Sequence, residues 1–105
     1  MCATIITPNF LWTLYDFTSF YFGQKPNKDN SYGIVEYTPQ AYVPSDLDLF
    51  FAVFNTLEIG ERPILDSFDG GAVQNINESF GYNGESDLDL EYAMTLMYPQ
   101  PVTLY

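Results

Sequence analysis

The chain has 105 residues, 47% of them apolar and 18% aromatic, and its 14 acidic and 3 basic side chains, with no histidine, give a formal charge of −11. These values fit one small globular domain or part of a larger one. The negative charge argues against a nucleic-acid partner and against an anionic membrane surface, since both bind clustered Lys and Arg. Without histidine, a Ser-His or Cys-His catalytic couple is excluded.

The first half of the chain predicts helix, strand and helix. Thr7-Pro8 is typical of a helix start, with Thr7 as the N-cap, and the helix should end before a polar loop over 23–31. Branched and aromatic residues favour a strand over 33–37. A second helix is expected near residue 45, with Ser45 as its N-cap and an apolar face formed by Leu47, Phe50, Phe51 and Phe54.

The second half repeats the alternation. A strand is predicted over 63–68, a loop rich in Asn and Gly over 72–84, a helix over 85–97 and a strand over 102–105. Strands that alternate with helices indicate an α/β fold with a mainly parallel sheet. Because the last strand stops where more would be expected, we interpret residues 1–105 as the N-terminal portion of a larger catalytic domain.

The most informative pattern is Glu85-Ser86-Asp87-Leu88-Asp89 in the third predicted helix. Glu85 and Asp89 are four residues apart, so both carboxyls lie on one helix face. If they were buried together they would share a proton, and one could then act as a general base in mild acid. The structural alternative is that acidic residues simply suit the first turn of a helix.

Further motifs add to this helix, and together they resemble the sedolisin family of serine-carboxyl peptidases, in its tripeptidyl-peptidase branch. The resemblance covers nearly the whole chain in the family's order, and the segments that carry it are Cys2-Ala3-Thr4-Ile5-Ile6-Thr7-Pro8, Leu14-Tyr15, Gly33-Ile34-Val35-Glu36, Ser45-Asp46-Leu47 with Phe50 and Phe51, Glu85 to Met94, and Val102-Thr103-Leu104-Tyr105.

The resemblance implies a subtilisin-like three-layer α/β fold, here truncated, and an acid-active peptidase whose substrates are peptides or proteins. It implies that Glu85 takes the proton of a serine nucleophile and that Asp89 hydrogen-bonds and tunes Glu85. The serine of a Gly-Thr-Ser segment, an oxyanion-stabilising Asp, a calcium site and a prodomain belong to the family but are not found in this sequence. The parent is expected to be extracellular, lysosomal or vacuolar, although this chain shows no signal peptide.

With the base but no nucleophile, the chain alone should be inactive. A non-catalytic acidic α/β interaction module and an inactive paralogue remain alternatives. Asp87 and Glu91 are expected to be dispensable for catalysis. Asn77-Glu78-Ser79 is a glycosylation sequon. Cys2, the single cysteine of the sequence, could pair with a downstream cysteine of the full protein or stay free.

Overall fold

The computed structural model describes residues 4–17, 25–37, 39–70 and 77–105, so the predictions for Cys2 fall outside the described residues. The elements of the described part follow in chain order: α1 (Pro8–Leu14), β1 (Tyr32–Ile34), α2 (Pro44–Phe54), the 3-10 turn η1 (Thr56–Glu58), β2 (Ile64–Leu65), α3 (Phe80–Met97) and β3 (Val102–Leu104). Helix and strand therefore alternate as the sequence predicts.

The strands form a parallel sheet in the order β1-β3-β2. Ile34 of β1 and Leu65 of β2 both lie opposite Leu104 of the central strand. The ladder continues past the strand ends, because the N–H of Glu36 donates to the carbonyl of Tyr105 at 3.0 Å. The predicted mainly parallel α/β sheet is confirmed.

Helix α1 begins as predicted. The Thr7 hydroxyl accepts a 3.2 Å hydrogen bond from the N–H of Phe10, and Pro8 occupies the first helical position, where its missing N–H costs nothing. The helix ends at Leu14, well before the polar segment.

The start of α2 corrects one prediction. Its N-cap is Val43 rather than Ser45, because Pro44 occupies the first helical position, two residues earlier than expected. Valine has no side-chain oxygen to satisfy the free N–H groups at this helix end. The predicted apolar face of α2 is confirmed, since Leu47 and Phe51 are fully buried.

Helix α3 begins at Phe80, so the predicted loop over 72–84 is wrong for its last five residues. The buried Asn83 explains the early start. Its Oδ1 accepts from the N–H groups of Glu78 and Ser79 at 2.9 and 3.1 Å, and its Nδ2 donates to the carbonyl of Ala41 at 2.7 Å. These tertiary bonds offset the low helix propensity of the residues around it.

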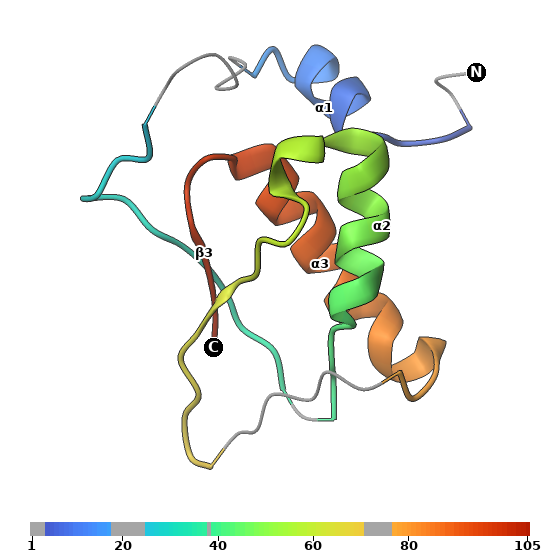
Figure 1. Cartoon of the computed structure of the whole chain (residues 1–105), viewed down its shortest axis with the longest axis vertical. Helices are drawn as coiled ribbons and strands as arrows, with labels where there is room; N and C mark the ends of the chain where they lie inside the picture. Colours follow the sequence, from blue (N-terminus) through green and yellow to red (C-terminus); the bar gives the residue numbers. More distant parts are fainter. Residues whose placement is uncertain (1–3, 18–24, 38, 71–76) are drawn as a thin grey trace.

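Figure 1 shows α2 and α3 side by side, with α3 also packed against β1 and β3. The core lies between these elements and consists of Ile34, Tyr42, Leu47, Phe51, Leu90, Met94 and Val102. Both residues of β2 are exposed. The structure thus shows a small α/β unit, and the three-layer, subtilisin-like architecture stays a prediction. Within the described residues, no helix is long and apolar enough to cross a membrane.

Candidate active site

Helix α3 carries the predicted pair. Glu85 and Asp89 are separated by one helical turn, and both side chains are exposed to solvent. Their orientation is set by the residues next to them, because Ser86 is 1% exposed and Leu90 is fully buried against the core. The buried face fixes the rotation of α3 and leaves the two carboxyls directed outward.

The position of the pair removes the structural alternative. Because α3 starts at Phe80, its first turn contains no acidic residue, and Glu85 and Asp89 lie in the second and third turns. The favourable interaction of carboxylates with a helix N-terminus fades after the first turn. Two like charges one turn apart are mildly unfavourable there, so stability of the helix does not account for them.

A third carboxyl lies beside the pair, and the sequence did not single it out as a site residue. Glu36 follows β1, and its Oε2 accepts a hydrogen bond from the buried Ser86 hydroxyl of α3. Its Oε1 is buried without a hydrogen-bond partner among the described residues.

The bond from Ser86 holds the Glu36 carboxyl against α3. Burial raises the pKa of Glu36, the bond from Ser86 lowers it, and the nearby charge of Asp89, followed by those of Asp87 and Glu85, raises it further. The site thus contains three carboxyls from two elements, β1 and α3. Only the strand-to-helix packing brings them together, so no local sequence pattern could have shown it.

The described residues do not complete a catalytic couple. Ser86 is the serine nearest the pair, but it is buried and already donates to Glu36, so substrate cannot reach it. No group of three or more metal-ligating side chains is found in the described ranges. Asp48, which could have belonged to such a cluster, instead binds Arg62 at 2.7 Å, and this contact lowers the pKa of Asp48 to about 2.

Asp87 and Glu91 lie on another side of α3, facing α2. Asp87 is 8% exposed and accepts a 2.6 Å hydrogen bond from the N–H of Val43, the residue that lacks a capping side chain. Burial raises the pKa of Asp87. It also raises the pKa of Glu91 to about 7, helped by the charges of Asp87 and Asp46. Asp87 is therefore a structural residue, which the sequence did not reveal.

Comparison with known proteins agrees with the resemblance. The chain is 44% identical over 104 residues to Tripeptidyl-peptidase SED1 of Arthroderma otae. It is 39% identical over 105 residues to Aorsin of Aspergillus oryzae and 34% identical over 106 residues to Tripeptidyl-peptidase sed1 of Aspergillus fumigatus. These alignments cover at least 99% of the chain but only 15–16% of the relatives' length. No family model and no solved structure matches.

The predicted resemblance to the tripeptidyl-peptidases of the sedolisin family is thereby confirmed. It extends along nearly the whole chain, so Glu85 and Asp89 fall inside the matched region.

Proposed function

We propose that the chain is the N-terminal portion of the catalytic domain of a serine-carboxyl peptidase that hydrolyses peptides or proteins in acid. The observation that carries the proposal is the exposed Glu85–Asp89 pair, which lies beyond the first turn of α3. The similarity to two tripeptidyl-peptidases supports it. The rest of the catalytic domain would supply the serine nucleophile.

In this mechanism Glu85 is the general base. Its carboxylate takes the proton of the serine hydroxyl as the serine oxygen bonds to the carbonyl carbon of the scissile peptide. When the tetrahedral intermediate collapses, the C–N bond breaks and Glu85 returns the proton to the leaving amine. Water then attacks the acyl-enzyme by the same route, which frees the serine and releases the acid product.

Asp89 is proposed as the residue that orients Glu85. It lies one turn further along α3, within reach of a hydrogen bond once either carboxyl holds a proton. Glu36 adds a third carboxyl, and Ser86 anchors it to the same helix. Mild acid suits this arrangement, because burial, together with the neighbouring carboxylates, raises the pKa of Glu36.

The other components belong to the parent protein. An oxyanion-stabilising Asp, a calcium site and a prodomain are proposed for it, and no residue of this chain is assigned as a calcium ligand. An extracellular, lysosomal or vacuolar location is proposed, which the acidity of the chain suits because many carboxyls are protonated in an acidic compartment.

The proposal is tested by assaying the full-length parent across acid to neutral pH on two peptides that differ only in a free or a blocked N-terminus. Cleavage in acid, with loss of activity toward neutral pH, is the expected result. Release of tripeptides from the free peptide alone identifies a tripeptidyl-peptidase, and cleavage of both identifies an endopeptidase. An inactive parent with an intact fold would favour the acidic interaction module.

A further inference from the structure

We propose that Asn77 carries an N-linked glycan whose inner sugars cover the N-terminal end of α3. The proposal rests on the extracellular, lysosomal or vacuolar location given above, because N-glycosylation takes place in the secretory pathway. Asn77-Glu78-Ser79 is the only Asn-x-Ser/Thr sequence among the 105 residues. Its presence alone is weak evidence, so the argument depends on the structure around it.

The three residues of the sequon directly precede α3, and all three are exposed to solvent. The buried side chain of Asn83 fixes the backbone of the sequon, because its Oδ1 accepts hydrogen bonds from the N–H groups of Glu78 and Ser79. Ser79 is the N-cap residue of α3, but its side chain makes no capping hydrogen bond. The backbone of the sequon is therefore fixed by hydrogen bonds, while Asn77, the residue that would carry the glycan, is exposed.

Asn77 also borders an open depression of about 460 Å³. The ring of Phe80, 89% exposed, and the half-exposed Leu88 contribute apolar surface to it. Asp46 and Glu91 contribute carboxyl groups. Aromatic and aliphatic side chains suit the apolar faces of sugar rings, and carboxylates accept hydrogen bonds from sugar hydroxyls.

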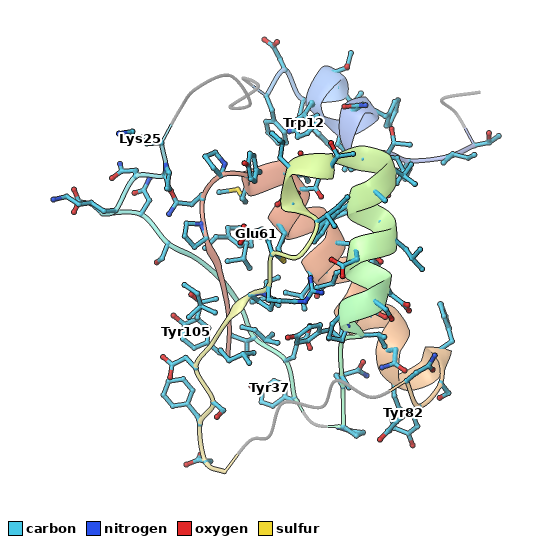
Figure 2. The ribbon with its side chains drawn as sticks, viewed as in Figure 1. Trp12, Lys25, Tyr37, Glu61, Tyr82 and Tyr105 are labelled. Atoms are coloured by element: carbon cyan, nitrogen blue, oxygen red, sulfur yellow. The ribbon has the colours of Figure 1, made fainter. Side chains whose placement is uncertain are left out.

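The placement leaves the proposed catalytic pair free. Glu85 and Asp89 do not line the depression. In Figure 2 the labelled Tyr82 marks this end of α3, on the opposite side of the view from Tyr105, which follows the central strand β3. A glycan on Asn77 would thus cover apolar surface without blocking the exposed carboxyls.

The test is glycopeptide mass mapping of the full-length parent secreted from a eukaryotic host, with and without enzymatic removal of N-glycans. The wild type and Ser79→Thr, which keeps the sequon, should carry sugar at Asn77. Asn77→Gln and Ser79→Ala should lose it. A secreted wild-type protein with unmodified Asn77 would overturn the proposal.

A parent that stays inside the cytosol would overturn the proposed location instead. The same mapping on a parent directed by a foreign secretion leader then decides the glycan separately, by sugar at Asn77 or its absence. To test the covering of α3, the melting temperature is compared before and after glycan removal. A drop in the wild type that is absent in Phe80→Ala supports contact with the ring, and an equal drop in both overturns it.

Discussion

The carboxylate of Asp87, on α3, accepts a 2.6 Å hydrogen bond from the backbone N–H of Val43, at the start of α2. The bond pairs the N–H of Val43 itself, the residue just before the first turn of α2, with a side chain 44 positions away. The bond joins the two helices that flank the core. It also shows that the acidic residues of α3 serve different purposes on different faces.

Asp87→Ala should therefore destabilise the parent by about 1–3 kcal/mol, because a buried N–H is left unpaired. Asp87→Asn keeps an oxygen acceptor and should cost less. Urea unfolding measures both, and Asp66→Asn, in an exposed segment, is the matched control. Unfolding of Asp87→Ala at the same urea concentration as the wild type would show that the bond to Val43 adds nothing to stability.

The buried Glu58 should make the folding stability of the parent depend on pH. It is 2% exposed, and burial raises its pKa from 4.5 to about 7, against the effect of hydrogen bonds from Thr95 and Asn55. A carboxyl with a raised folded-state pKa favours the folded state fully below its unfolded value and loses this contribution as pH rises through the folded value. Stability should fall between pH 4.5 and about pH 7.

Glu58→Gln should remove the part of this loss that comes from Glu58, which its pKa shift puts at about 3 kcal/mol. Glu91, whose pKa is also raised to about 7, should keep its own part. The measurement is the melting temperature of the parent at a series of pH values, with Glu61→Gln, an exposed neighbour, as control. A Glu58→Gln curve parallel to that of the wild type would show that another group controls the pH response.

Glu36 should act on catalysis through its contact with α3. Glu36→Ala leaves the buried Ser86 hydroxyl without its acceptor and removes a carboxyl beside Asp89. We expect kcat of the parent to fall by about tenfold, as when a positioning contact is lost, with KM little changed. The double variant with Ser86→Ala, which no longer leaves a hydroxyl unpaired, should regain stability but not kcat. Recovery of both would reduce Glu36 to a structural residue.

The isolated chain should associate in solution. The edge strands β1 and β2 each have one unpaired side in the described sheet, and Val35, Ile64 and Phe68 expose more than half of their surface nearby. Size-exclusion chromatography should show oligomers that Ile64→Lys reduces. A sharp monomer peak from the wild-type chain would favour a self-contained module.

Local patterns predicted the elements whose signals are local. The Thr7-Pro8 cap, the apolar face of α2 and the parallel strands were all recognisable, because capping and periodicity act over a few residues. Features that depend on distant contacts were missed or placed wrongly. The early start of α3 needs Asn83 bonded to Ala41, and the N–H of Val43, just before α2, is paired by Asp87 of α3.

The candidate site likewise combines features that local sequence patterns predict with features that depend on distant contacts. The spacing of Glu85 and Asp89 placed both on one face of a helix, as the structure has them. Glu36 joins them only when β1 packs beside α3, and its sequence neighbours gave no sign of this. The helix-start alternative could be rejected only once the first residue of α3 was known.

The most direct test of the proposed catalytic pair is kcat/KM of the full-length parent in acid for Glu85→Gln, Asp89→Asn and the control Glu91→Gln. Glu91 shares α3 but faces away, among Asp46 and Asp87. Glu85→Gln should lower kcat/KM by about 10²–10⁴ or more, the contribution of a general base. The kcat/KM of Asp89→Asn should lie between those of Glu85→Gln and the wild type, and the kcat/KM of Glu91→Gln should stay near the wild-type value. With the fold intact in all three, a Glu85→Gln enzyme as active as Glu91→Gln would contradict the account.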